Sequence, residues 1–391
     1  MKRVINWISG KRALTIAGAA ALLSGCQVIP KTETVSTGPE AGPTPDPTAT
    51  ALPSDGTRHQ VALLVPMSGS TAAVGQSLAN ATTMALLDTN AENIRITTYD
   101  TGRGAGEAAR QAIVDGNKLI LGPLLASNVP AVQAQARPAS VPAIAFSNDT
   151  KVAAADVFLM GHVPEQSIRR SVKYARASGS NSFAALLPSG DYGQRSFSAL
   201  KNALADYGGS LIASESYARG NTSIVSASQR LRSKGGYDTV LIADGARLAT
   251  RAAGELRRSG AEGTRILGTE LWSGEASLAR SPSVEGALFS AVSDSRFKRF
   301  ADSYEARFGS KPYRIATLGY DSVLLTLRVA RDWRAGSNFP VKQLYDRGGF
   351  LGVDGPFRFG RDGIAERALE VRQVTSGAVK QVDAAPKSFG N

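Results

Sequence analysis

Residues 61–65 begin a pattern of apolar and polar positions that repeats through most of the chain. These residues, VALLV, are all apolar, and Pro66 and a Ser-Gly-Ser turn follow them. A run that is apolar on both faces indicates a strand inside a sheet that helices cover on both sides. From Val74 to Ala85 apolar residues recur at helical spacing, which predicts an amphipathic helix packed on that sheet.

The alternation of strand and helix continues to about residue 267. Further strands are expected at 94–99, 118–121, 142–146, 183–187, 210–217, 239–243 and 265–267. The helices between them are expected at 105–115, 127–137, 165–177, 194–207, 224–234 and 246–259. This alternation predicts an α/β fold of parallel sheets with helices on both faces. Two successive sets of units, separated by a less regular stretch at 157–160, predict two lobes.

The loops after the predicted strands carry polar residues that could contact a ligand. Sheets of this class bind ligands beyond the carboxyl ends of their strands, so the loops should line a shared cleft. These loops lie at 67–75, 122–127, 147–150, 189–193 and 270–273. The candidates that we select from them are Ser68, Ser127, Ser147, Asp149, Tyr192, Glu270 and Trp272. The alternative is that such residues only cap helices and hydrogen-bond turns, with Ser127 capping the helix at 127–137.

Residues 1–25 have the features of a secretion signal rather than of a folded element. Four basic residues precede an apolar segment at 13–23, which is too short to span a bilayer. The segment ends in Leu-Ser-Gly-Cys, and this resembles the lipobox of bacterial lipoproteins. Cys26 is the only cysteine in the chain. A free buried thiol is the alternative, but the position directly after the apolar segment favours lipidation of Cys26 and a membrane anchor.

The segment 27–58 has the composition of a tether. It contains Pro30, Pro39, Pro43, Pro45, Pro47 and Pro53 among Thr, Ser, Gly and Ala. Such a segment buries too little apolar surface to offset the entropy lost on ordering. At about 3 Å per residue for extended proline-rich chain, it would hold the folded part several tens of ångströms from the membrane.

The charge of the chain does not indicate a nucleic-acid-binding protein. The formal net charge is +12, but four of the 45 Lys and Arg residues lie in the predicted signal, which leaves about +8. The remaining basic residues are scattered along predicted helices without an aromatic-interleaved patch. We interpret them as a solvated surface, with attraction to anionic lipid or cell-wall polymer as a secondary possibility.

Several motifs in order along the chain resemble one family. They are VALLVPMSG at 61–69, YDT at 99–101, LILGPL at 119–124, PAIAFS at 142–147, DYG at 191–193, LGYD at 318–321 and FLGVDGPFRF at 350–359. Together they resemble the type I periplasmic binding proteins of the leucine/isoleucine/valine-binding group. The resemblance implies two lobes joined by a hinge of three crossings. It implies a first lobe of 59–162 and 294–335, including helices at 295–309 and 316–334, and a second lobe of 163–293 and 336–391.

Within that group, the YDT and GPL motifs together with the lipobox are most similar to the penicillin-binding-protein activator lipoproteins. That similarity implies an outer-membrane lipoprotein whose partner is a peptidoglycan synthase. Gln27, directly after the cysteine, favours the outer membrane, since an Asp there retains lipoproteins in the inner membrane of enteric bacteria. The best-known activators carry a helical-repeat domain before this one, whereas here the tether occupies that place.

The family also implies a site for an amino acid. Relatives hold the ligand's ammonium group with a tyrosine and a glutamate, which correspond to Tyr192 and Glu270, with Trp272 close by. They hold its carboxylate with small hydroxyl residues, where this chain has Ala126 and Asp149. An aspartate would repel a carboxylate, although a shift of one residue would bring Ser127 or Thr150 to the same position.

The sequence offers little support for an enzyme or a cofactor. It has two histidines, His59 and His162, and no Cys/His spacing typical of a metal site. Ser198 and Lys201 form S-x-x-K, but they lie in an amphipathic helix without the partner motifs of penicillin-recognising enzymes. The glycines from Gly102 to Gly106 lack the last glycine of a dinucleotide site. We therefore expect a non-enzyme: a tethered regulator of a cell-wall synthase or, alternatively, a solute receptor of an ABC-type importer.

Overall fold

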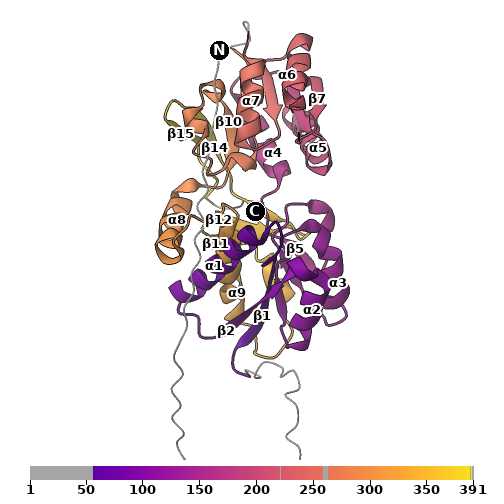
Figure 1. Cartoon of the computed structure of the whole chain (residues 1–391), viewed down its shortest axis with the longest axis vertical. Helices are drawn as coiled ribbons and strands as arrows, with labels where there is room; N and C mark the ends of the chain where they lie inside the picture. The colour runs from indigo at the N-terminus through magenta and orange to yellow at the C-terminus, as the bar shows by residue number, and fades with distance from the viewer. Residues whose placement is uncertain (1–55, 221, 259–262, 388, 390–391) are drawn as a thin grey trace, which may run out of the picture. The chain divides into compact units, whose positions relative to one another are not determined.

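The computed structural model describes residues 56–220, 222–258, 263–387 and 389, so the predicted signal, Cys26 and nearly all of the tether lie outside it. Its first lobe contains a parallel sheet in the order β2-β1-β3-β4-β5 (Figure 1). The strands are β1 (His59–Val65), β2 (Ile94–Asp100), β3 (Leu119–Leu121), β4 (Ala143–Ala145) and β5 (Val157–Leu159). The helices of this lobe are α1 (Ala72–Asp88), α2 (Ala105–Val114), α3 (Val129–Ala136), α8 (Asp294–Phe308) and α9 (Ala316–Ala330).

The packing of β1 explains why its sequence has no polar face. Val61, Leu63 and Val65 belong to a core cluster that includes residues of α1 and α9. Ala62 and Leu64 point the other way, into a cluster with residues of α2 and α3. Because successive side chains of a strand alternate between faces, both faces must be apolar when helices cover both.

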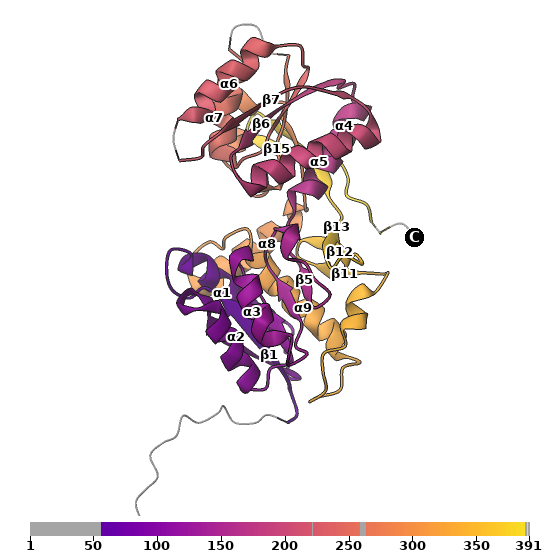
Figure 2. The same ribbon diagram turned by 90° about the vertical axis from the view of Figure 1, so that its right-hand side faces the viewer.

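The second lobe repeats this arrangement around a larger sheet, in the order β15-β14-β10-β9-β8-β6-β7. Helices α4 and α5 pack on one face of the sheet, and α6 and α7 pack on the other (Figure 2). The strands are β6 (Ser182–Pro188), β7 (Ser210–Tyr217), β8 (Thr239–Ile242), β9 (Arg265–Leu267), β10 (Leu288–Ala291), β14 (Glu370–Thr375) and β15 (Ala378–Asp383). The helices are α4 (Pro164–Ala177), α5 (Asp191–Tyr207), α6 (Ser223–Lys234) and α7 (Ala246–Leu256).

The last part of the chain differs from the sequence-based expectation in two respects. Strands β14 and β15 run antiparallel to their neighbours, so the second sheet is not wholly parallel. The segment 336–391 was expected in the second lobe, but it divides between the lobes. A small sheet of β11 (Phe350–Gly352), β12 (Gly355–Phe359) and β13 (Ala365–Arg367) buries Phe350, Phe357 and Phe359 in the core cluster of β1. The assignment of 336–367 to the second lobe is therefore wrong, because its aromatic residues belong to the first core, and the chain crosses between Arg367 and Glu370.

A close approach between strand and helix recurs at the first βα junction of each lobe. A Cβ atom on Gly75 of α1 would lie 1.8 Å from the carbonyl oxygen of Pro66. A Cβ atom on Gly193 of α5 would lie 1.8 Å from the carbonyl oxygen of Pro188. Only glycine fits at either position, and these contacts fix where the first turn of each helix lies beside its strand.

Helix α3 begins later than predicted. Ser127 lies in a 3-10 turn, Ala126–Asn128, and the residue before α3 is Asn128, which makes no side-chain capping hydrogen bond. The predicted serine cap is therefore wrong. Pro130, near the amino end of α3, fits the helix there because its missing N–H would have no intrahelical partner.

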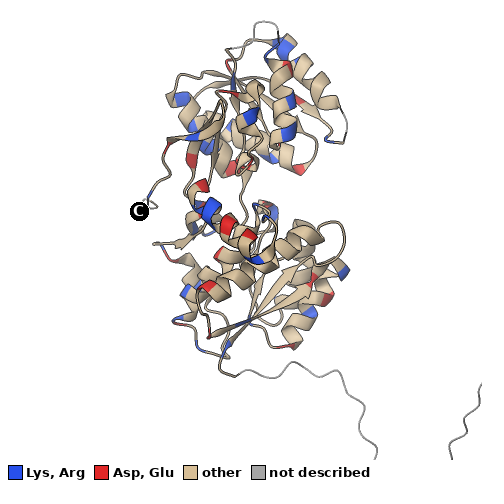
Figure 3. Cartoon of the chain, turned by 60° about the vertical axis from the view of Figure 1, so that its left-hand side comes forward, with Lys and Arg blue, Asp and Glu red and all other residues tan. Residues whose placement is uncertain are grey.

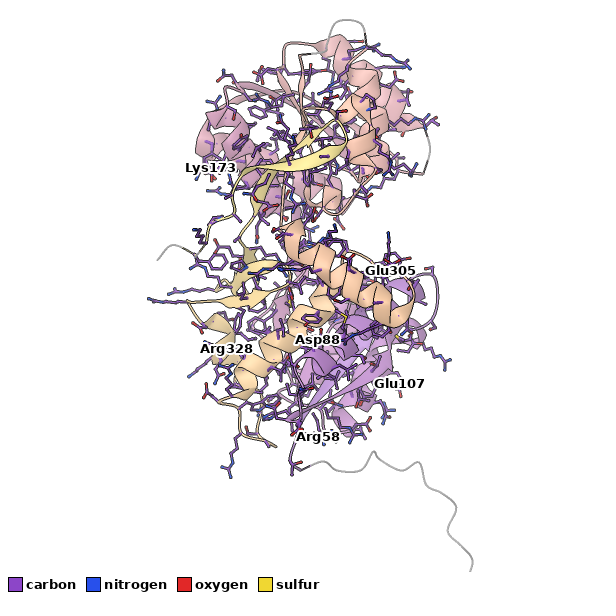
Figure 4. The ribbon with its side chains drawn as sticks, turned by 90° about the vertical axis from the view of Figure 1, so that its left-hand side faces the viewer. Arg58, Asp88, Glu107, Lys173, Glu305 and Arg328 are labelled. Atoms are coloured by element: carbon purple, nitrogen blue, oxygen red, sulfur yellow. The ribbon has the colours of Figure 1, made fainter. Side chains whose placement is uncertain are left out.

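Helices α8 and α9 return to the first lobe and pack on α1. Asp88, at the end of α1 and labelled in Figure 4, accepts a hydrogen bond from Tyr320 of α9 at 3.0 Å. Its carboxylate also lies 2.6 Å from Arg307 of α8. Beneath this contact, Met84 packs against Phe300 and Tyr304. A segment distant in sequence thereby completes the first lobe.

The charged side chains of both lobes are interspersed rather than gathered by sign (Figure 3). Many of the basic ones are paired: Arg230 and Lys234 both contact Glu215, at 2.8 and 2.6 Å. The Arg230 and Lys234 side chains are exposed while Glu215 is partly buried, and ion pairs at the surface contribute little to stability. This distribution fits the solvated surface that the sequence predicts.

Candidate functional site

A cavity of about 310 Å³ is lined by residues of both lobes and of the crossing between them. From the first lobe come residues that shortly follow β3 and β4 and the residues just before α9. From the second lobe comes the loop after β9. The lining residues that matter below are Ser147, Asn148, His162, Glu270, Ser273, Glu275 and Arg314. The expectation that loops at strand ends meet around a cavity thus holds for three of the predicted loops, 122–127, 147–150 and 270–273.

Glu270 provides the acidic group of the cavity. It begins a 3-10 turn, Glu270–Trp272, directly after β9, and it is 9% exposed. Its Oε1 accepts a hydrogen bond of 2.9 Å from the hydroxyl of Tyr192, which lies in the first turn of α5. Its Oε2 is buried and has no hydrogen-bond partner among the described residues. Burial raises the pKa of Glu270 to about 7, although the Tyr192 hydrogen bond acts in the opposite direction.

Tyr192 is held in place by its neighbours. Its hydroxyl is also hydrogen-bonded to Thr269 Oγ1 at 2.9 Å, and Arg219 lies 5.2 Å from the centre of its ring. Burial, and then the charge of Glu270, raise the pKa of Tyr192 well above its usual value. The phenol therefore stays protonated and acts as a hydrogen-bond donor towards Glu270.

Arg314, two residues before α9, provides the basic group of the cavity, and no sequence motif pointed to it. Its Nε donates to Ser273 Oγ at 3.2 Å, which connects it to the loop of Glu270. Its Nη1 donates to Asp354 Oδ1 at 2.7 Å and to Thr317 Oγ1 at 3.1 Å. The guanidinium lies 4.3 Å from the ring centre of Phe297. Its Nη2 is buried and has no hydrogen-bond partner among the described residues.

Asp354 fixes the orientation of Arg314. It is fully buried and accepts hydrogen bonds from Thr317 Oγ1 at 2.9 Å and from Arg314, and it is hydrogen-bonded to His162 Nε2 at 2.8 Å. Burial alone would raise the pKa of Asp354, but Arg314 and His162 outweigh it, so the pKa is strongly lowered. Asp354 is therefore ionised, whereas burial and the charge of Asp354 raise the pKa of the neighbouring Asp321 to about 7.

Of the predicted site residues, Ser147 and Glu270 line the cavity. Tyr192 is not among the lining residues but donates a hydrogen bond to Glu270. Trp272 does not line it: the indole is fully buried, donates from Nε1 to the carbonyl of Asp244 at 2.9 Å and packs near Phe289. A turn of three residues points Glu270 and Trp272 in different directions, which the sequence alone could not indicate.

The other candidates also lie outside the cavity lining. Ser68 hydrogen-bonds to Asp100, whose carboxylate accepts from the backbone of Met67 and Gly102 at 2.7 and 2.8 Å. Ser127 is exposed in its 3-10 turn. Asp149 accepts from the backbone of Lys151 at 3.1 Å and lies 3.9 Å from Arg195 Nη1. The expected repulsion between Asp149 and a ligand carboxylate therefore loses its basis, since Asp149 is engaged elsewhere.

Neither histidine has the surroundings of a metal ligand. His59 stacks on Trp333 with ring centres 4.1 Å apart, and burial lowers its pKa. His162 is the partner of Asp354 described above. Across the residues that the structure describes, no cluster of three or more metal-binding side chains is present. Within the same residues, no helix combines the length and apolar character needed to cross a bilayer.

The sequence of 59–378 matches the family model described as "Periplasmic binding protein". The chain belongs to the periplasmic binding protein family. Its family membership implies a periplasmic or extracellular location, and the family consists of substrate-binding proteins rather than enzymes. The periplasmic-binding-protein resemblance inferred from the sequence is confirmed by this match, and the two-lobed α/β fold is confirmed by the structural likenesses.

Three relatives illustrate how far the similarity of this periplasmic binding protein extends. A putative branched-chain amino acid ABC transporter protein from Rhodospirillum rubrum is 20% identical, with a TM-score of 0.73 over 83% of this chain and 100% of that chain. LpoA from Haemophilus influenzae is 18% identical, with a TM-score of 0.64 over 84% of this chain but 60% of that chain. At these identities both likenesses show the fold alone. A Rickettsia prowazekii protein, described as uncharacterized protein RP748, is 30% identical over 163 residues, 40% of this chain and 43% of its own length.

Proposed function

We propose that this periplasmic binding protein is a non-enzymatic receptor for a small ligand that carries a protonated amine, bound in the cavity between Glu270 and Arg314. The observation that carries the proposal is the buried Oε2 of Glu270, which has no hydrogen-bond partner among the described residues. A buried carboxylate oxygen without a partner is costly, and an ammonium group would satisfy both its charge and its hydrogen-bonding capacity.

Tyr192 supports the same role. Its hydroxyl occupies the other carboxylate oxygen, Oε1, and thereby leaves Oε2 for a ligand. This is also the pair that the family resemblance assigns to the ammonium group of an amino acid. The ligand class fits the R. rubrum relative, whose description names a branched-chain amino acid transporter.

A thermal unfolding screen of the purified full chain tests this proposal. Common amino acids, simple amines and the matched carboxylic acids without an amine would be added in turn. A ligand that binds only the folded state at 100 times its dissociation constant stabilises that state by about 2.7 kcal/mol. We expect the melting temperature to rise with at least one amine-bearing compound and not with its amine-free analogue. Stabilisation by amine-free acids alone would contradict the proposal.

A second function is favoured by the amino-terminal segments of the chain rather than by the cavity. The lipobox around Cys26, the proline-rich tether and the likeness to LpoA support an outer-membrane lipoprotein that activates a peptidoglycan synthase. The folded lobes would then contact the synthase, with or without a ligand in the cavity. Chemical crosslinking in cell envelopes discriminates the two functions: a synthase should be captured in this case, and a permease in the case of an importer receptor.

The membrane anchor that both functions could use can be tested directly. We expect Cys26→Ala to move the protein from the membrane fraction to the soluble or unprocessed fraction, because the thiol is the attachment point of the predicted lipid. Mass spectrometry of the mature amino terminus would detect the lipid in the unchanged chain. Unaltered fractionation together with an unmodified amino terminus would exclude the anchor.

A further inference from the structure

We infer that a groove on the first lobe is a docking site for an acidic segment of a partner protein that also presents apolar side chains. The groove has a volume of about 410 Å³ and is walled by α1, α8, α9 and β11 with the turn that follows it. None of its lining residues lines the cavity between Glu270 and Arg314. The docking site therefore does not depend on a ligand in that cavity.

The apolar part of the groove combines buried and exposed side chains. Met84 of α1 and Phe300 of α8 are buried at its base. Leu351 also lines it and is 58% exposed, although both of its neighbours in β11 are buried. Leu87, three positions after Met84 on the same side of α1, is 61% exposed. Single exposed leucines are ordinary, but exposed apolar side chains beside a groove with charged edges are typical of a protein-protein contact.

The charged part of the groove is basic. Arg296, Arg299 and Phe300 lie on one side of α8, because positions three and four apart in a helix face the same way. Arg296 donates from Nη1 to the carbonyl oxygen of Gly352 at 3.0 Å and pairs with no carboxylate among the described residues. Arg299 is exposed and has no hydrogen bond or ion pair within the same part of the chain. Both guanidiniums can therefore receive a carboxylate from outside.

Asp88 does not neutralise these two arginines. It supplies the carboxylate among the described lining residues, and Figure 4 shows it on the side of the lobe where α8 lies. Its carboxylate lies 2.6 Å from Arg307 and accepts a hydrogen bond from Tyr320 at 3.0 Å, so it is already engaged. A partner carboxylate would form charge-assisted hydrogen bonds with the free guanidiniums, while apolar side chains next to it enter the groove.

A segment of another protein fits this groove better than a bilayer or a second copy of the chain does. A bilayer presents a broad surface and attracts faces that carry clusters of several basic residues, whereas this site is concave and has two free arginines. In a symmetric dimer the same patch meets itself, so Arg296 and Arg299 would approach their own copies as like charges. Both alternatives are distinguished by the experiment below.

Photo-crosslinking in intact cells that produce the full chain tests the docking site. p-Benzoylphenylalanine would replace Leu351, and mass spectrometry would identify the crosslinked peptide. We expect a segment of another protein with an Asp or Glu within about one helical turn of the crosslinked apolar residue. The same probe in place of Val114, which is 60% exposed in α2, is the matched control and should not form this adduct. Crosslinking only to a second copy, to residues 27–58, to lipid or to nothing would overturn the inference.

Arg299→Glu tests the charge of the site in cells that carry the probe at position 351. We expect the adduct to fall at least about tenfold, because a glutamate would repel the partner's carboxylates. The melting temperature should remain nearly unchanged, because Arg299 has no described partner to lose. Arg251→Glu is the matched control, since Arg251 is likewise an exposed helical arginine without a partner among the described residues, but it lies in α7 of the second lobe. An unchanged adduct in Arg299→Glu, or equal loss in both variants, would exclude docking by charge at this groove.

Discussion

Glu270→Gln is expected to reduce affinity for an amino acid by at least about 30-fold, since loss of one member of a buried charge pair costs about 2–5 kcal/mol. The substitution keeps the shape of the side chain and removes only its charge. The amide could still accept a hydrogen bond from Tyr192, so the fold of the loop should be retained. The melting temperature without ligand should not fall, because the substitution also removes a poorly solvated carboxylate whose pKa burial raises to about 7.

The control for this prediction is Glu275→Gln. Glu275 also lines the cavity, but its side chain is exposed, and an exposed charge contributes much less to binding than a buried one. We expect the affinity of the Glu275→Gln variant for the amino acid to remain within about a factor of three of that of the unchanged chain. If both variants lost affinity equally, a general effect of negative charge would explain binding, and the specific role of Glu270 would be excluded.

Asp354→Asn should produce the largest loss of stability among the substitutions discussed. Asp354 is 0% exposed and neutralises Arg314 and Arg367 while it contacts His162 and Thr317. Without its charge, the buried Arg367 and the partly buried Arg314 would lose the carboxylate that lies between them. Removing one member of a buried ion pair costs about 3–5 kcal/mol. Chemical denaturation of the full chain would measure the change in the free energy of unfolding.

Asp346→Asn is the matched control for Asp354→Asn. Asp346 lies 3.5 Å from Arg328, which is labelled in Figure 4, and both side chains are exposed. An exposed pair contributes about 0–1 kcal/mol, so this variant should unfold at nearly the same denaturant concentration as the unchanged chain. A similar small effect for Asp354→Asn would mean that the buried cluster does not stabilise the hinge.

The fold could be predicted from the sequence because its signals are local. The apolar run of β1 has no polar face, and the structure shows helices on both faces for that reason. The failure at 336–367 has a different origin. Phe350, Phe357 and Phe359 are apolar in either lobe, and only their packing against residues near position 61 decides which core they join.

The candidate site could be predicted only in part. Glu270 and Tyr192 were selected because they follow strand ends and match family positions, and the structure brings their side chains together. Arg314 was missed because it is one of 45 basic residues and has no local motif. Its role depends on Asp354 and Ser273, which lie 40 and 41 positions away in the chain. Trp272 was misplaced because the direction of a side chain in a tight turn depends on tertiary packing.

The pH dependence of amino-acid binding tests most directly the claim that the Glu270 carboxylate receives the amine. With a pKa of about 7 in the free protein, Glu270 is ionised above pH 7 and protonated below it, and only the ionised form pairs with an ammonium group. Burial is the main cause of this raised pKa; the hydrogen bond from Tyr192 lowers it, the charge of Glu165 raises it and the charge of Arg195 lowers it. His162, which lines the same cavity, has a lowered pKa because it is buried.

Calorimetric titration of the full chain at pH 8 and pH 6, with the amino acid that stabilises it most, would measure this dependence. The predicted result is one bound amino acid per chain, with affinity about tenfold lower at pH 6, because a proton must leave Glu270 before the amine binds. Equal affinity at the two pH values, or no binding of any amino acid, would contradict the account.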